Sequence, residues 1–267
     1  MLEVDYVRSG YRAVGLWAAD QWSESPECVE QQLWHLFLTG NRRRVLSKWL
    51  GDSGREDSVQ TAVDVYREHT PSISLVSGAA EVLRILGKHF KLGLVTDGYS
   101  MTQRRKIEAL SLESLISTIV VSDEIGGRST WKPSPAPLLE ACARLDTTPS
   151  RAVYIGDNPH KDFFGARVAG LASVRLRLSA GLHSTCEPQC KEAQPDGVVA
   201  ELREVPHAVD SLELNVVRAR ECRSSYFTFD PSPGHCTIDE VSYREDGTAA
   251  VAVIQPDLPT PEDARDA

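Results

Sequence analysis

The sequence has 267 residues, of which 41% are hydrophobic and 25% are charged, the proportions of an ordinary globular protein. It carries 29 Lys and Arg against 38 Asp and Glu, which gives a formal net charge of −9. The composition excludes wholesale disorder. The acidic balance argues against a nucleic-acid partner or an anionic membrane surface, because binding to either relies on clustered basic residues.

The sequence gives no sign of a membrane span or of export. No stretch approaches the roughly 18 to 20 apolar residues that a transmembrane helix needs. The N-terminus lacks the basic and apolar regions of a signal peptide, and the six cysteines are scattered. We therefore expect reduced thiols, no membrane partner and a cytoplasmic location.

Residues 1–72 are predicted to form a small helical unit. They hold four of the five tryptophans, and Val29, Leu33 and Phe37 recur at helical spacing. Ser25 followed by Pro26 resembles a helix start, with the serine as the cap. We expect the tryptophans to form the core of this unit.

Residues 73–207 alternate between helices and short apolar strands, a pattern typical of right-handed crossovers and a parallel sheet. This predicts an α/β fold with a doubly wound parallel sheet. Helices are expected at 78–89, 102–112, 135–145 and 162–169, and strands at 91–95, 118–121, 152–155, 172–176 and near 197–199.

Residues 208–267 change texture and are predicted to form a small β-rich extension with a frayed, acidic and proline-rich end. Asp246-Gly247 is a hairpin signal. Strands are expected at 212–217, 226–229, 238–243 and 249–254. We expect this extension to be a separate unit.

Polar groups follow three of the predicted strands. Thr96-Asp97-Gly98 follows the strand at 91–95, Lys132 lies beyond the strand at 118–121, and Asp157 and Asp162 follow the strand at 152–155. Ligands of open parallel sheets bind at the carboxyl ends of strands. These residues are therefore expected to meet at one edge of the sheet.

The residue types suit phosphate chemistry. Phosphoryl transfer needs charge neutralisation on the non-bridging oxygens, which a hydroxyl at Thr96 and an ammonium at Lys132 can supply. Asp157 and Asp162 suit Mg²⁺, which takes carboxylate and water oxygens. Each residue also has a plainer interpretation: Thr96 could simply end a strand, Lys132 could be a solvated loop lysine, and Asp162 could cap a helix.

The segments "LGLVTDG", "WKPSPAPLLEA" and "YIGDNPHKDFFGARVAG" resemble, in order, the second, third and fourth motifs of the haloacid dehalogenase-like hydrolase superfamily. The resemblance covers about residues 75–205, and residues 1–72 resemble the helical cap of that family. It implies catalytic roles for Thr96 and Lys132, a phosphate site that also includes Asp97 and Gly98, and metal binding by Asp157 and Asp162.

The resemblance implies a Mg²⁺-dependent phosphohydrolase that acts on a small phosphorylated metabolite through an aspartyl-phosphate. Two alternatives stay open. One is a catalytically inactive relative that serves as a phosphate-binding or interaction module. The other is a dehalogenase, which uses the same nucleophile without metal; the two carboxylates at Asp157 and Asp162 argue against it. The substrate is not predicted, and a homodimer is left open.

The first motif of that family, an apolar strand ending in Asp-x-Asp, is not recognised in this sequence. Asp5 has no strand before it and no carboxylate at position 7, and the resemblance suggests that the chain starts downstream of the motif. In the family this strand lies mid-sheet and carries the nucleophile. One candidate replacement is the strand at 249–254, which Asp257 follows without a second carboxylate. The chain as given is therefore expected to turn over phosphate esters negligibly.

His183, Cys186 and Cys190 are close enough in sequence to suggest zinc ligands. A fourth ligand does not follow at a usual spacing. We therefore interpret this segment as a loop with incidental thiols.

Overall fold

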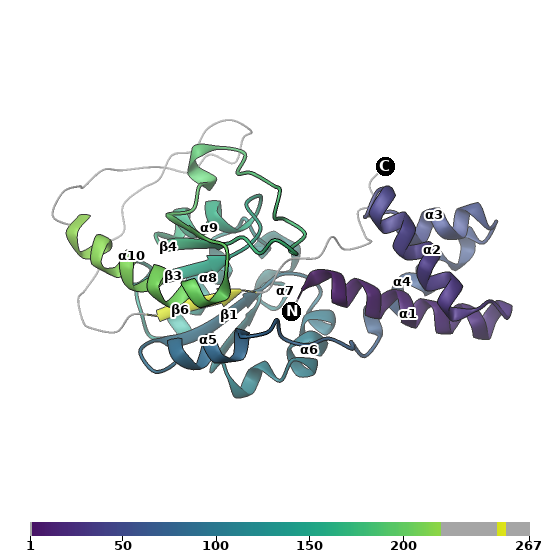
Figure 1. Cartoon of the computed structure of the whole chain (residues 1–267), viewed down its shortest axis with the longest axis horizontal. Helices are drawn as coiled ribbons and strands as arrows, with labels where there is room; N and C mark the ends of the chain where they lie inside the picture. Colours follow the sequence, from purple (N-terminus) through teal and green to yellow (C-terminus); the bar gives the residue numbers. More distant parts are fainter. Residues whose placement is uncertain (1, 220–249, 255–267) are drawn as a thin grey trace.

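The computed structural model describes residues 2–219 and 250–254, and these residues form a helical cap beside an α/β core (Figure 1). The cap is the N-terminal part of the chain, and the core follows it. Among the described residues, none of the helices has both the length and the apolar character needed to cross a membrane.

The cap consists of helices α1 (Glu3–Trp22), α2 (Pro26–Thr39), α3 (Val45–Asp52) and α4 (Val59–Glu68). The predicted start of α2 is confirmed, because the Ser25 side chain accepts a hydrogen bond from the Cys28 backbone N–H and Pro26 occupies the first turn. Trp49 is buried, and Trp17, Trp22 and Trp34 pack partly buried against the same apolar cluster. The tryptophans thus belong to the cap core, as the sequence predicts.

The core is built on a six-stranded parallel sheet in the order β2-β1-β6-β3-β4-β5. The predicted α/β fold is confirmed, and the strands predicted between residues 91 and 199 are all present. Their bounds are β1 (Lys91–Thr96), β2 (Thr118–Val121), β3 (Ala152–Gly156), β4 (Ala172–Leu176), β5 (Gly197–Val199) and β6 (Ala250–Ile254).

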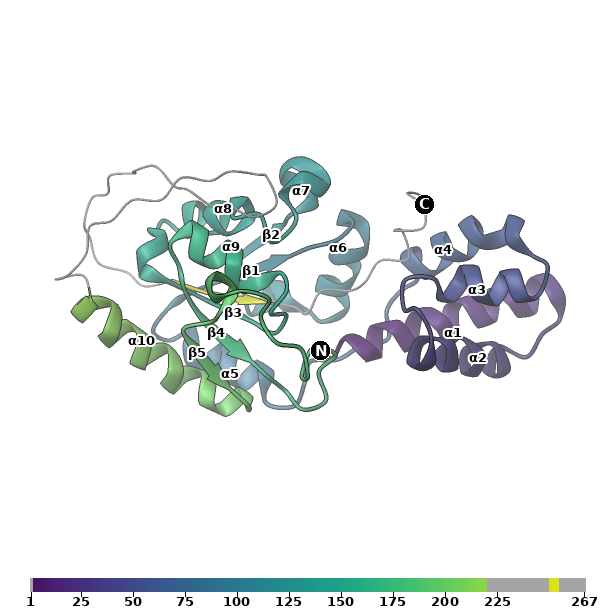
Figure 2. The same cartoon turned by 90° about the horizontal axis from the view of Figure 1, so that it is seen from above.

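Helices cover both faces of the sheet (Figure 2), which explains why the strands are apolar on both sides. Helices α5 (Ala79–Leu86) and α10 (Val205–Ala219) pack with Leu94 and Ile155 on one face. Helices α8 (Ala136–Arg144) and α9 (Asp162–Ala169) pack with Val95 and Tyr154 on the other. Helix α6 (Ser100–Ala109) follows β1, and the short α7 (Asp123–Gly126) follows β2.

The strand predicted at 212–217 is wrong, because these residues belong to α10. Val205, Val209 and Leu212 are spaced four and three residues apart and all pack in the core cluster, which is the pattern of an amphipathic helix. The predicted boundary after residue 207 therefore lies inside a helix. The strands predicted at 226–229 and 238–243, and the Asp246-Gly247 hairpin, lie outside the described residues.

Strand β6 lies in the middle of the sheet, between β1 and β3, and is not part of a separate appendage. It pairs in parallel with both neighbours, with Val253 in register with Leu94 on one side and Ile155 on the other. The candidate replacement for the mid-sheet strand is confirmed in position. Without β6, the facing edges of β1 and β3 would be unpaired, and exposed edges are a liability that proteins avoid.

Candidate active site

The end of β1 forms a closed, buried turn. Thr96 is buried, and its Oγ1 donates a hydrogen bond to Gln103 Oε1 at 2.8 Å. Gly98 has a φ of +117°, and a Cβ atom there would lie 2.6 Å from Gln103 Nε2. Only glycine fits this turn. The backbone can therefore turn sharply beside the carboxyl end of the sheet.

Asp97 ties this turn to the two neighbouring segments. Its Oδ1 accepts a hydrogen bond from Ser122 Oγ, and its Oδ2 accepts one from the Lys132 backbone N–H at 2.8 Å. Asp97 is 4% exposed. The carboxylate thus holds the Lys132 segment beside this turn, and phosphate binding at Asp97 stays a prediction.

Lys132 is held deep in the site. Its side chain is 0% exposed, and its Nζ donates to Asp162 Oδ1 at 2.9 Å and to Tyr154 Oη at 3.1 Å. The Lys132-Pro133 bond is cis. The Pro133 carbonyl packs against Gly165 of α9, where a Cβ atom would lie 2.6 Å from the oxygen. The loop that carries Lys132 is thus clamped against α9.

Asp162 begins α9 and accepts four hydrogen bonds. Its Oδ1 accepts from Lys132 and from Tyr154 Oη at 2.8 Å, and its Oδ2 accepts from the backbone N–H groups of Asp157 at 3.1 Å and Asn158 at 2.9 Å. A carboxylate offers about four lone-pair sites, so these donors use its capacity. This geometry favours a positioning role for Asp162, and direct coordination of a metal by it stays a prediction.

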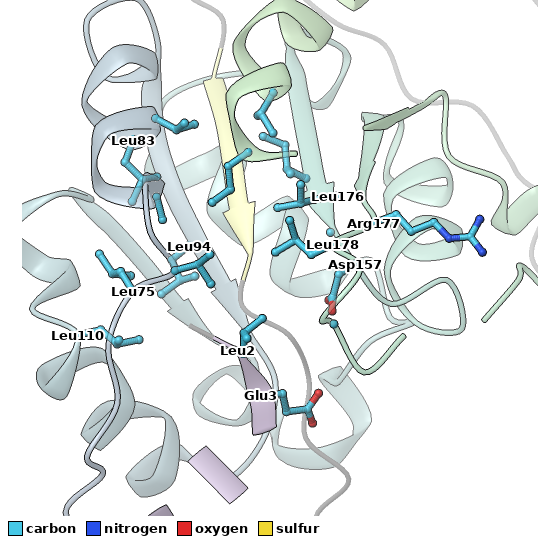
Figure 3. A pocket seen from close by; sticks show the side chains of 18 of the residues that line it. Leu2, Glu3, Leu75, Leu83, Leu94, Leu110, Asp157, Leu176, Arg177 and Leu178 are labelled. Atoms are coloured by element: carbon cyan, nitrogen blue, oxygen red, sulfur yellow. The ribbon is translucent and has the colours of Figure 1, made fainter. Parts of the chain in front are cut away.

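Asp157 follows β3 directly and is half-buried. Its carboxylate reaches the polar end of a cavity beside Glu3, the first residue of α1 (Figure 3). Burial lowers the pKa of the neighbouring Arg175, and the charge of Asp157 is among the effects that partly offset this. Because Mg²⁺ is usually held by one or two carboxylates with waters and substrate oxygens, Asp157 fits as its protein ligand.

The cavity itself has a volume of about 130 Å³ and lies between α5, β1, β3 and β4. Most of its lining is apolar, and Leu83, Leu94 and Leu176 line it (Figure 3). Pockets for small-molecule ligands are typically about 300–1,000 Å³. We interpret the cavity as loosely packed core below the site.

The predicted site residues lie at one edge of the sheet. Hydrogen bonds link Asp97 to Lys132, Lys132 to Asp162, and Asp162 to the backbone of Asp157. Thr96 joins the network through its carbonyl, which accepts from Ser122 Oγ at 3.2 Å. Sequence reasoning missed three buried partners that complete this network: Gln103, Ser122 and Tyr154.

These partners carry weak sequence signals. Tyr154 lies inside an apolar strand, where a tyrosine is usually a packing residue, and its hydroxyl becomes informative only through its contacts with Lys132 and Asp162. Ser122 directly follows β2, at the edge where functional groups are expected. That position is the one signal that could have identified it.

The loop at His183–Cys190 is held by hydrogen bonds to Arg175. The carbonyls of His183 and Cys186 both accept hydrogen bonds from the Arg175 guanidinium at 2.8 Å. Within residues 2–219 and 250–254, no group of three His, Cys, Asp or Glu side chains is placed to hold a metal ion. The cysteines at 28, 142, 186 and 190 are free thiols.

Asp5, the first carboxylate considered for the nucleophile, lies in helix α1 of the cap. The strand that ends between Thr96 and the Gly156-Asp157 turn is β6. Its sequence continues as Gln255-Pro256-Asp257, which lies outside the described residues.

Comparisons with known proteins identify relatives of this chain among phosphatases. A glyceraldehyde 3-phosphate phosphatase from Methanopyrus kandleri is 38% identical over 130 residues, 49% of this chain and 53% of the relative. A phosphoserine phosphatase from Thermus thermophilus is 31% identical over 166 residues, 61% of this chain and 63% of the relative. The chain thus spans between 53% and 63% of the length of these two relatives.

The fold also matches solved structures. A HAD-hydrolase from Bacillus subtilis, solved with bound magnesium, superposes with a TM-score of 0.54 at 22% identity, over 77% of this chain and 93% of that one. The sequence profile of the haloacid dehalogenase-like hydrolases matches residues 25–176, more than half of the chain. The chain therefore belongs to the haloacid dehalogenase-like hydrolase family.

Proposed function

We propose that this chain carries the phosphate and metal site of a Mg²⁺-dependent phosphohydrolase that acts on a small phosphorylated metabolite. The observation that carries the proposal is the buried chain of contacts from Asp97 through Lys132 to Asp162 and on to the Asp157 turn. It concentrates one ammonium, three carboxylates and turn backbone at the edge where β1 and β3 end. The names of the relatives, which are phosphatases of small phosphorylated compounds, support the substrate class.

Each residue has a separate task in this proposal. Lys132 neutralises charge on a non-bridging oxygen, and Asp162 and Tyr154 hold its ammonium in place. The Thr96 hydroxyl and the backbone of the Asp97-Gly98 turn orient the phosphate. Asp157 holds Mg²⁺, which when bound supplies positive charge to the phosphoryl oxygens.

A phosphohydrolase of this kind also needs a nucleophile that attacks the phosphorus atom. The family resemblance assigns it to an aspartate that follows the mid-sheet strand, and in this chain β6 occupies that position. Asp257 is the first carboxylate after β6 in the sequence, three residues beyond Ile254, and it lacks the second carboxylate of the family motif. We therefore expect binding without appreciable turnover by the chain as given.

The proposal is tested by calorimetric titration of the purified chain with inorganic phosphate and, separately, with Mg²⁺. Lys132→Met should abolish phosphate binding, and Asp157→Asn should weaken Mg²⁺ binding at least tenfold. Lys48→Met serves as the control, because Lys48 is an exposed cap lysine paired with Asp52. If phosphate does not bind, or if Lys132→Met leaves its affinity unchanged, the proposed site is wrong.

Turnover tests whether the chain as given supplies a nucleophile. Hydrolysis of p-nitrophenyl phosphate should be negligible, which fits a phosphate-binding relative as well as a phosphohydrolase whose nucleophile is missing. A Mg²⁺-dependent rate near 1 s⁻¹, an ordinary enzyme turnover, would contradict this expectation. Loss of that rate in Asp257→Asn would then assign the nucleophile to the residues after β6.

A further inference from the structure

The hydroxyl group of Thr96 has a partner inside the fold. Its Oγ1 donates a hydrogen bond to Gln103 Oε1 at 2.8 Å, and the two residues are 1% and 3% exposed. A hydroxyl carries a single proton, so it donates to one acceptor at a time. The proton that the proposed function directs to a phosphate oxygen is therefore the proton that Gln103 holds in this structure.

The backbone around Gln103 fixes where its amide group lies. Gln103 belongs to the first turn of helix α6, and its backbone N–H donates to the Tyr99 carbonyl at 3.0 Å. The helix thereby carries the side chain back to Thr96, seven residues earlier in the chain. Gln103 Nε2 lies so close to Gly98 that a Cβ atom there would be 2.6 Å away. The oxygen of the amide thus faces Thr96, and its nitrogen faces Gly98.

A carboxamide can serve a hydroxyl in two opposite ways. Its oxygen accepts the hydroxyl proton, whereas its NH₂ group donates to the hydroxyl oxygen. A half-turn about the last side-chain bond exchanges the two groups, and this bond in glutamine has a broad, roughly two-fold preference. Oxygen and nitrogen are similar in size, and Gly98 has no side chain to obstruct either of them. Gln103 can therefore hold the Thr96 proton or release it without leaving its place.

We propose that Gln103 is a positioning residue that directs the Thr96 proton. When a phosphate group binds, the Gln103 amide turns over, its Nε2 donates to Thr96 Oγ1, and the Thr96 hydroxyl donates to a phosphate oxygen. The proton stays on Thr96 throughout, and no covalent bond changes. Hydrogen bonds in such a chain polarise one another, so the bond from Gln103 strengthens the bond to phosphate. The inference rests on the proposed function, because it takes a phosphate to lie beside Thr96.

The test is a double-mutant cycle measured by calorimetric titration of the full chain with inorganic phosphate. The measured quantity is the loss of phosphate affinity caused by Thr96→Val, first in the wild type and then in variants of Gln103. In the wild type this loss should be about tenfold or more, the value of one hydrogen bond to a charged group. A general change in the charge of the site affects both members of each pair and cancels in the ratio.

Gln103→Glu is the decisive variant. At about pH 8 a carboxylate is ionised, only accepts hydrogen bonds and keeps the Thr96 proton, so Thr96→Val should cause no further loss. Gln103→Met adds no charge and offers only a weak acceptor, so the loss on Thr96→Val should persist. A residue that only fills space would not separate these two variants. Gln31→Glu, at an exposed glutamine of cap helix α2, is the matched control for the added charge and should keep the wild-type ratio.

A second measurement does not depend on the folding of Gln103→Glu. In the ¹⁵N-labelled wild type, the side-chain NH₂ signals of Gln103 are assigned by their absence in Gln103→Met. Saturation with inorganic phosphate should shift these signals, because Nε2 gains Thr96 Oγ1 as an acceptor. The shift should be lost in phosphate-saturated Thr96→Val, which lacks that acceptor.

An equal loss on Thr96→Val in the wild type and in Gln103→Glu would overturn the inference, and so would Gln103 NH₂ signals that phosphate leaves unchanged. In either case, phosphate binding that Lys132→Met abolishes would leave the proposed phosphate site standing. If inorganic phosphate does not bind to the wild type, the proposed function fails together with the inference.

Discussion

The substitution Asp162→Asn tests the buried network most directly. Each carboxylate oxygen of Asp162 accepts two hydrogen bonds. The amide of asparagine keeps one acceptor oxygen and replaces the other with an NH₂ group. That NH₂ group would face two hydrogen-bond donors and no acceptor. The ammonium of Lys132, with a side chain 0% exposed, then loses its ion pair with this carboxylate. Removing one partner of a buried ion pair costs about 3–5 kcal/mol.

Urea unfolding followed by far-ultraviolet circular dichroism measures this loss in the free energy of unfolding. The control is Asp52→Asn, which removes the partner of Lys48 in a pair whose side chains are 59% and 55% exposed. Exposed pairs contribute about 0–1 kcal/mol, so the control should change little. A loss below about 1 kcal/mol for Asp162→Asn would refute the view that this pair is buried and coupled.

A double-mutant cycle with Lys132→Met separates coupling from the two individual losses. The double variant no longer buries the Lys132 ammonium, so its loss should be smaller than the sum of the single losses by about 1–3 kcal/mol. Tyr154→Phe removes one of the four hydrogen bonds to Asp162 and the acceptor of one from Lys132 Nζ, and it should cost about 1–3 kcal/mol. This milder variant keeps the reasoning testable if Asp162→Asn does not fold, and strict additivity in the cycle would contradict it.

Three further predictions concern the sheet, the cap and the cavity. Ala252→Pro removes a backbone N–H from β6, which pairs on both sides, and leaves a strand acceptor without its donor, so it should lower the free energy of unfolding by about 1–3 kcal/mol or more; an unchanged midpoint in urea would place β6 outside the sheet. Burial lowers the pKa of His69 below its usual 6.5, so the unfolded chain takes up the proton more readily and His69 should cost stability as the pH falls below about 6.5. The free energy of unfolding should therefore fall more between pH 7.5 and 5.5 in the wild type than in His69→Gln, while the exposed-histidine control His35→Gln should behave as the wild type does. Val82→Ile adds one methylene beside the 130 Å³ cavity and should raise the free energy of unfolding by up to about 0.8 kcal/mol, and a loss of stability would show that the cavity cannot accept the group.

The local sequence determined the alternating core. The apolar strands between residues 91 and 199 and the helices that separate them form where the pattern predicts them, because a strand buried on both faces reads as a continuous apolar run. The polar residues that follow β1 and β3, with Lys132 beyond β2, also meet as predicted, since parallel strands end at a common edge. The pattern was misjudged at residues 212–217, where the spacing of Val205, Val209 and Leu212 is helical.

Only the tertiary structure decided which side chains in the site are hydrogen-bonded to one another. The sequence placed Asp157 and Asp162 in one motif, but only the fold shows that Asp162 is used up by Lys132, Tyr154 and two backbone donors while Asp157 reaches the cavity. It alone brings Arg67 of the cap onto Tyr99 of the core. It also inserts β6 between two strands that precede it by about a hundred residues or more, because pairing two open apolar edges is a long-range gain that local spacing does not record.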